Sequence, residues 1–205
     1  EFIWGSGVAV DSQNNLYVVD EWLNRVTVFA SDGTYQMDWS TVGSDESGPN
    51  GTSGIAIDKE GNLLVTDGRS HTVKKFTPEG ELLSTWGKQG SAEGELDSPW
   101  GITVDNEGFI YVADFKNHRV QKFTDGGNFV AQFGSHGTKR GQLSYPNSVA
   151  VDPEGDVYVC DWSENGWEQG RVHIYEKDGR FLTSLTGDAQ QLSLWAQMTV
   201  DANAD

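Results

Sequence analysis

The sequence predicts an all-β fold built from repeated units of four antiparallel strands, and three observations support this prediction. A five-residue pattern recurs along the chain, and its closing aspartates at Asp11, Asp58, Asp105 and Asp152 lie 47 residues apart. Each period contains four short runs of strand-forming residues. Clusters of glycine, aspartate, asparagine and proline, which are typical of turns, separate these runs.

The third repeat shows the four expected strands most clearly. We name them a, b, c and d, and in this repeat they cover residues 101–104, 109–113, 119–123 and 129–133. The a–b turn begins with aspartate and ends with glycine, as in 105–108, because aspartate bonds the backbone ahead of it and glycine accepts positive φ. Since the strands alternate in direction, the b–c and d–a connections emerge together, on what we call the b–c/d–a face.

A four-stranded unit of this size cannot bury both of its faces alone. Radial stacking of such units buries them and leaves only short edges, so the sequence predicts a β-propeller. The residue midway along strand a is always small, which suits the crowded position nearest the axis. These residues are Ala9, Ala56, Thr103, Ala150 and Thr199.

The repeat shows no linker at which the chain could be divided, so we expect one domain over residues 1–205. It contains about four complete blades and part of a fifth. The expected repeats are 7–53, 54–100, 101–147 and 148–196, followed by the partial repeat 197–205.

One run in the third repeat resembles the NHL repeat, a family named for its Asn-His-Leu signature. Residues 111–123 contain Asn117-His118-Arg119-Val120, with valine where leucine often stands. The d–a connection 87–99 recurs as 134–146 with the same glycine, leucine and proline spacing, which also looks like that family. NHL propellers commonly have six blades, so the resemblance implies that this chain is part of a six-bladed ring.

Composition restricts the classes of partner. The formal net charge of −17 argues against nucleic acid, because phosphate recognition depends on a surface rich in lysine and arginine. No apolar run is long enough to cross a bilayer. The first residue is Glu1 rather than methionine, which is compatible with a removed signal peptide, and we expect a secreted or periplasmic location.

Repeated polar residues are interpreted as parts of the blade rather than as a site. The aspartates that follow strand b at positions 20, 67, 114 and 161 can cap loop amides or pair with nearby arginines. His118 belongs to the repeat signature and receives a structural role. We therefore expect no cofactor, with zinc bound by converging histidines or calcium in the channel as alternatives.

The family resemblance supplies a test for catalysis. In peptidyl-hydroxyglycine amidating lyases, whose propellers this chain resembles, metal-binding histidines lie just before strand a. None of the corresponding residues here is histidine, and no constellation like that of the streptogramin lyases can be assigned. The corresponding residues are Ser6, Ser53, Trp100, Asn147 and Ala196.

Function is therefore expected where the repeats differ. The b–c connection of the fourth repeat, residues 161–171, has five extra residues and two tryptophans, and aromatic anchors dominate recognition surfaces. Both tryptophans could instead fold onto the neighbouring blade. The predicted binding residues are Trp22, Trp100, Asn147, Trp162, Glu164, Trp167 and Glu168.

These observations favour a non-catalytic recognition or scaffold propeller. We expect it to bind a protein, a peptide or a glycan through the b–c/d–a face, where loops of varied sequence stand on a rigid scaffold. The alternative is a metal-dependent lyase or hydrolase with its site at the channel mouth. Nucleic-acid binding is disfavoured by the charge.

Overall fold

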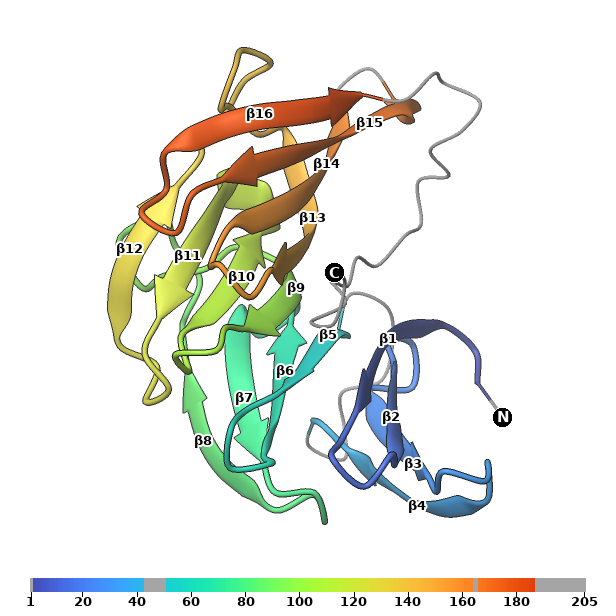
Figure 1. The fold of residues 1–205 in the computed structure, drawn as a ribbon. Coiled ribbons are helices and arrows are strands. Elements are labelled where there is room, and N and C mark those ends of the chain that lie inside the picture. The colour runs from blue at the N-terminus through green and yellow to red at the C-terminus, as the bar shows by residue number, and fades with distance from the viewer. Residues whose placement is uncertain (1, 43–50, 164–165, 187–205) are drawn as a thin grey trace.

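The computed structural model describes residues 2–42, 51–163 and 166–186, and contains four antiparallel sheets of four strands each (Figure 1). The first sheet contains β1 (Gly5–Val10), β2 (Leu16–Asp20), β3 (Arg25–Phe29) and β4 (Tyr35–Ser40), and the second contains β5 (Thr52–Ile57), β6 (Leu63–Asp67), β7 (Thr72–Phe76) and β8 (Leu82–Trp86). The third contains β9 (Pro99–Val104), β10 (Ile110–Asp114), β11 (Arg119–Phe123) and β12 (Phe129–Phe133), and the fourth contains β13 (Tyr145–Val151), β14 (Val157–Ser163), β15 (Gly166–Tyr175) and β16 (Phe181–Thr186).

These sheets are the predicted blades, which we number 1 to 4 in chain order. The prediction of four complete blades is confirmed, and the expected partial blade at 197–205 lies outside the described residues. Within the described part of the chain, no helix has the length and apolar character needed to span a bilayer.

The innermost strands β1, β5, β9 and β13 lie side by side in an arc, and each contacts the next (Figure 1). Their approach is so close that side chains cannot fit at some positions. A Cβ at Gly101 would lie 2.7 Å from the Cα of Ser148, and one at Gly54 would lie 2.4 Å from the carbonyl oxygen of Trp100. Glycine at these two positions of strand a therefore reflects the close packing of neighbouring backbones around the axis.

Three hydrophobic cores fill the spaces between successive blades. Tyr17 and Val26 of blade 1 pack with Leu63 of blade 2, and the same pattern recurs between blades 2 and 3 and between blades 3 and 4. Each core combines strands b and c of one blade with strands a, b and c of the next. Neighbouring blades thus bury each other's faces, as the propeller prediction requires.

The turns form as their sequence predicts. In blade 2, Asp58 Oδ1 accepts the amide hydrogens of Glu60 and Asn62 at 2.9 and 2.8 Å, and Gly61 has a φ of 87°. The c–d turns place glycines at positive φ beneath a large aromatic side chain of the preceding blade. Trp86 covers Gly127, and Trp39 covers Gly80 in the same way.

The prediction of a long loop at residues 161–171 is wrong. Strands β14 and β15 continue their pairing beyond Asp161 and Arg171 to Ser163 and Gly166, with an irregular register between these pairs. The extra residues therefore extend a hairpin. Continued pairing satisfies backbone N–H and C=O groups that an open loop would leave to solvent.

Candidate functional site

The four repeated aspartates hold the b–c/d–a face together from inside. They are between 0 and 1% exposed. Asp114 accepts the amide hydrogen of Asp97 at 2.7 Å and the Arg119 Nε hydrogen at 2.8 Å, and Asp161 accepts the amides of Ser144 and Tyr145 at 2.8 and 2.7 Å. We call this arrangement the aspartate latch. Asp20, Asp114 and Asp161 tie strand b to the segment that precedes their own blade. Asp67 instead accepts the amide hydrogens of Arg69 and Ser70 and pairs with the Lys74 ammonium. These bonds confirm the structural interpretation of the repeated aspartates.

Two histidines reinforce the same connections. His71 and His118 occupy left-handed backbone positions, with φ of 59° and 56°. His71 Nδ1 accepts the amide hydrogen of Ser98 at 3.0 Å, and His118 Nδ1 donates to the carbonyl oxygen of Ser144. The ring of His136 lies against that of His118, with centroids 4.0 Å apart and planes inclined by 35°. The predicted structural role of His118 is confirmed.

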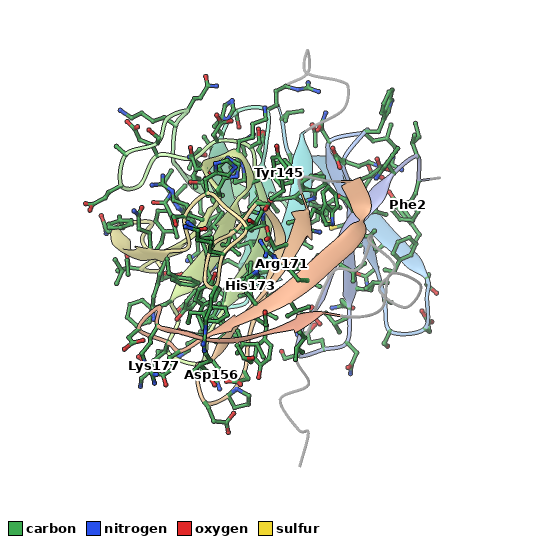
Figure 2. All side chains as sticks on the ribbon, turned by 90° about the horizontal axis from the view of Figure 1, so that it is seen from above. Phe2, Tyr145, Asp156, Arg171, His173 and Lys177 are labelled. Atoms are coloured by element: carbon green, nitrogen blue, oxygen red, sulfur yellow. The ribbon has the colours of Figure 1, made fainter. Side chains whose placement is uncertain are left out.

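Four aromatic side chains from blades 3 and 4 meet on this face, and we call them the aromatic cluster: Trp100, Phe115, Tyr145 and Trp162. The Trp100 ring centroid lies 5.1 Å from those of both Phe115 and Trp162, and Phe115 lies 5.2 Å from Tyr145. Tyr145 is labelled in Figure 2. Trp100 and Trp162 meet edge to face, the other two pairs are tilted, and these ring contacts restrain all four side chains.

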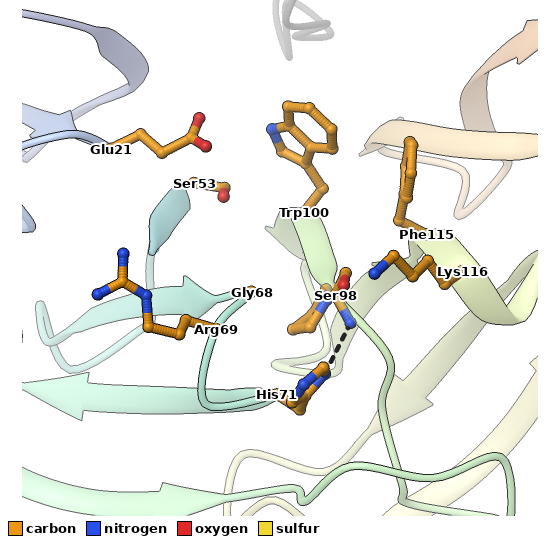
Figure 3. A pocket seen from close by; sticks show the side chains of 10 residues that line it. Glu21, Ser53, Gly68, Arg69, His71, Ser98, Trp100, Phe115 and Lys116 are labelled. Atoms are coloured by element: carbon orange, nitrogen blue, oxygen red, sulfur yellow. Dashed lines mark hydrogen bonds between the residues drawn. The ribbon is translucent and has the colours of Figure 1, made fainter. Parts of the chain in front are cut away.

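Beside the aromatic cluster is an open pocket of about 320 Å³, which we call the axial pocket because blades 1, 2 and 3 all contribute to it (Figure 3). Trp100 and Phe115 form its apolar wall, and Glu21 and Arg69 approach from the opposite side. Lys116 and His71 complete the lining, with His71 held by its hydrogen bond to Ser98. An apolar wall that faces charged groups suits ligands with one apolar surface and a polar edge.

The structure brings three of the predicted binding residues together. Trp100 lines the axial pocket, and Trp162 packs against it while only 8% exposed. Asn147, with its amide oriented to satisfy both contacts, donates to the carbonyl oxygen of Cys160 at 2.9 Å and accepts from Trp162 Nε1 at 3.2 Å. Trp162 and Asn147 thus support the wall that Trp100 presents.

The other four predicted residues are placed differently. Trp22 is 43% exposed in the β2–β3 turn, one residue beyond the pocket residue Glu21. Glu164 lies outside the described residues, as do the side chains of Trp167 and Glu168, whose backbone belongs to β15.

Sequence reasoning missed Glu21, Arg69, Phe115 and Lys116 as pocket residues. The signal was available, because each lies one or two residues after a repeated aspartate, where the blades differ. Glu21, Gly68 and Phe115 immediately follow the aspartates of blades 1 to 3, and all three line the pocket. The latch therefore positions the variable residues that follow it.

The lone cysteine is unsuited to nucleophilic chemistry. Burial raises the pKa of the Cys160 thiol to about 11, so the thiol stays protonated at neutral pH. Within the described ranges, the one group of three possible metal ligands is Asp58, Glu60 and Asp125. It lies in the a–b and c–d turns, and the Lys75 ammonium is 2.7 Å from Asp58 and 2.8 Å from Asp125. A lysine thus already supplies the positive charge there.

A family model described as NHL repeat matches residues 53–76, 96–123 and 143–170. Each match begins within three residues of the start of strand a and ends in strand c. Three stretches of the chain therefore match the NHL repeat, as the resemblance indicated, and they lie in blades 2, 3 and 4 of the propeller. The comparison with curated proteins found no match.

Solved propellers share this fold at low sequence identity. Virginiamycin B lyase from Staphylococcus aureus is 14% identical with a TM-score of 0.64, and the match covers 90% of this chain and 55% of the lyase. A catalytically inactive histidine-to-alanine form of that lyase with quinupristin is 15% identical with a TM-score of 0.66, and the match covers 92% of this chain and 57% of the lyase. A Bacteroides caccae protein of unknown function is 17% identical with a TM-score of 0.71, and the match covers 93% of this chain and 69% of that protein. The chain thus spans little more than half the length of the lyases it matches.

Proposed function

We propose that this chain is a recognition propeller that binds a peptide, a protein segment or a glycan through its b–c/d–a face. The observation that carries the proposal is the axial pocket. Trp100 and Phe115 form its apolar wall, and both stand where the repeats differ. Residues shared by all blades hold the scaffold, and residues that vary line the pocket.

The chemistry of the pocket matches ligands with mixed surfaces. An indole and a phenyl ring can cover an aliphatic side chain or the apolar face of a sugar ring, while charged groups opposite bind the polar edge. The rings are fixed by the aromatic cluster, so binding costs little conformational entropy. We retain Trp22, Glu164, Trp167 and Glu168 in the proposed surface because their connections belong to the same face.

The test uses peptide and glycan arrays probed with the purified chain, followed by titration of the strongest ligand. Trp100→Ala should weaken that binding by at least about 2 kcal/mol, roughly 30-fold, as expected for a central aromatic anchor. Tyr35→Ala is the matched control, since Tyr35 is 55% exposed on the outermost strand of blade 1. Equal affinity of Trp100→Ala and the unsubstituted protein would exclude the axial pocket.

A second candidate function is lyase chemistry on the same face, and the observation in its favour is the structural likeness to virginiamycin B lyase. His71 is the histidine that lines the axial pocket, although its Nδ1 already accepts the Ser98 amide. Assays with cyclic peptide lactones, with and without added divalent metal, test this candidate. Turnover that disappears in His71→Ala but survives in His136→Ala would replace the recognition proposal.

A further inference from the structure

On the b–c/d–a face, the space between blades 2 and 3 is filled differently from the corresponding space between blades 3 and 4. Between blades 2 and 3, Gln121 Nε2 donates to the Glu95 carbonyl at 2.6 Å and to Asp114 at 3.0 Å, while its Oε1 accepts the Gly94 amide at 3.0 Å. Its cross-strand partner Gln132 accepts a hydrogen bond from Arg119 at 2.7 Å. Two glutamines thus fill this space and satisfy its polar groups.

The corresponding place between blades 3 and 4 is left open. Strand register puts His173 where Gln121 stands and Ser184 where Gln132 stands. His173 is 1% exposed, and neither of its ring nitrogens has a hydrogen-bond partner. It borders a pocket of about 430 Å³, which we call the rim pocket. Figure 2 shows His173 beside Arg171 on β15.

The rim pocket is positively charged on a strongly acidic protein. Lys139 and Arg140 line it, at the positions that Ala92 and Glu93 occupy in the preceding d–a connection. Arg140 Cζ lies 5.2 Å from the Phe181 ring centroid. Arg171 adds a third cation, and its charge is shared with Asp161 at 3.1 Å. Three cations against one carboxylate leave a net positive site.

We propose that the rim pocket binds an oxyanion, either a free phosphate or sulfate or a carboxylate carried by a larger ligand. Lys139 and Arg140 supply charge, Ser184 supplies a hydroxyl donor at the exposed side of the pocket, and His173 supplies a buried ring N–H donor. The site is separate from the axial pocket, because the two share no lining residue.

The geometry gives each group a distinct role. Burial lowers the pKa of His173 to about 4, so the ring is neutral at pH 7 and offers one N–H donor, for which a buried group without a partner needs an acceptor. Arg140, stacked on Phe181, presents guanidinium N–H groups at the mouth, and hydrogen bonds from charged donors to an anion are the strong ones. An oxyanion therefore completes both the hydrogen bonding and the charge balance of the pocket.

The experiment titrates the chain with sodium phosphate, sodium sulfate and sodium acetate at constant ionic strength maintained with sodium chloride. The readouts are the imidazole NMR signals of His173 and the thermal midpoint. We expect a saturable shift of the His173 signals. Saturation by phosphate or sulfate identifies a free oxyanion, whereas saturation by acetate alone identifies a carboxylate-bearing ligand. No saturable shift with any of the three anions overturns the proposal.

Two variants locate the binding. Lys139→Ala combined with Arg140→Ala should weaken it at least about tenfold, whereas Lys59→Ala combined with Lys177→Ala removes the same charge from exposed turns outside the pocket and should change little. His173→Gln with Ser184→Gln installs the blade 3 residues, and should abolish anion stabilisation, read from the thermal midpoint, in a folded protein. Unchanged affinity in either pocket variant would overturn the assignment.

Discussion

The ion pair between Arg119 and Asp114 is the most deeply buried charge interaction of blade 3. Asp114 is 0% exposed and Arg119 is 6% exposed, and Arg119 also donates to the carbonyl oxygens of Ser91, Ala92 and Glu95. Removing one member of such a pair leaves the other charge buried without its partner. The Arg119–Asp114 pair therefore stabilises the fold of the blade.

Arg119→Ala should lower the free energy of unfolding by about 3–5 kcal/mol, because Asp114 would lose its ionic partner inside the protein. Urea denaturation followed by tryptophan fluorescence measures this. The control is Arg180→Ala, which removes an exposed i,i+4 pair with Glu176 and should cost no more than about 0.5 kcal/mol. Equal losses in the two variants would contradict the structural role of the latch.

His173 should make stability depend on pH. Burial, together with the charge of Arg171, lowers its pKa from 6.5 to about 4, and Asp161 at 3.8 Å does not offset this because Arg171 binds that carboxylate. The unfolded chain therefore binds a proton that the folded chain excludes. The contribution of His173 to the free energy of unfolding is fully present above pH 7. It is lost as the pH falls from 6.5 to 4, and the loss is about 2 kcal/mol at pH 5.

Urea denaturation at pH 7.5 and pH 5 in chloride buffers measures this loss. In His173→Gln, the difference in the free energy of unfolding between the two pH values should be smaller by about 2 kcal/mol. A loss of the same size in His173→Gln would assign the pH dependence to other groups.

At this scale, the sequence identified the scaffold residues better than the site. Asp114 and His118 recur in the repeat, so their structural roles could be predicted from spacing. Phe115 and Lys116 could not be assigned to the pocket from spacing, because they line it only through the packing of blade 3 against blade 2, although the position after each repeated aspartate varies between blades. Trp162 as a binding residue stays a prediction, and its burial against Trp100 and Asn147 depends on three-dimensional packing that spacing along the sequence does not show.

At the scale of elements, the c–d turn and the aromatic residue above it form the joint between blades. A Cβ at Gly127 would lie 2.6 Å from Cγ of Trp86, and φ is 77°. Gly33 occupies the equivalent turn of blade 1 with φ of 83° and no atom within 4 Å of such a Cβ. The two glycines share the same backbone constraint and differ in packing.

Gly127→Ala should therefore destabilise the protein more than Gly33→Ala does. Both substitutions carry the cost of a non-glycine residue at positive φ, about 1 kcal/mol, while only the first collides with an indole, which adds about 1–3 kcal/mol. Thermal and urea denaturation of the two variants give the difference directly. Identical destabilisation would show that the aromatic contact contributes nothing.

The order of strands and their antiparallel pairing could be predicted because strand spacing and turn residues agree in every blade. The predicted loop at 161–171 is wrong, because the inserted residues extend the β14–β15 hairpin. An insertion can either leave a hairpin as a loop or lengthen it, and spacing alone does not distinguish these outcomes. The choice depends on cross-strand pairs such as Ser163 and Gly166.

At the scale of the whole molecule, the blades differ in how well their neighbours cover them. Strand β10 is buried along its entire length, whereas β1 has Val8 and Val10 more than half exposed. The residues equivalent to Val8 in blades 2 to 4, which are Ile55, Ile102 and Val149, are at most 5% exposed because the preceding blade packs on them. Stability is thus distributed unevenly along the arc.

Hydrogen exchange should reflect this gradient. Amides of β6 and β10 should exchange only through global unfolding, while amides of β1 should exchange through local opening at lower free energy. Mass spectrometry of peptic fragments measures both in one experiment. Uniform protection across these strands would show that the arc unfolds as one cooperative unit.

The aspartate latch also has a consequence for how the polypeptide is made. Asp20 binds the amide of Ile3, Asp114 that of Asp97 and Asp161 that of Ser144, each across 17 residues, and the longest reach of Arg119, to Ser91, is 28 residues. Short loops are inexpensive to close and form rapidly. As the chain leaves the ribosome, each blade can therefore fasten to the one before it while the next is still being synthesised.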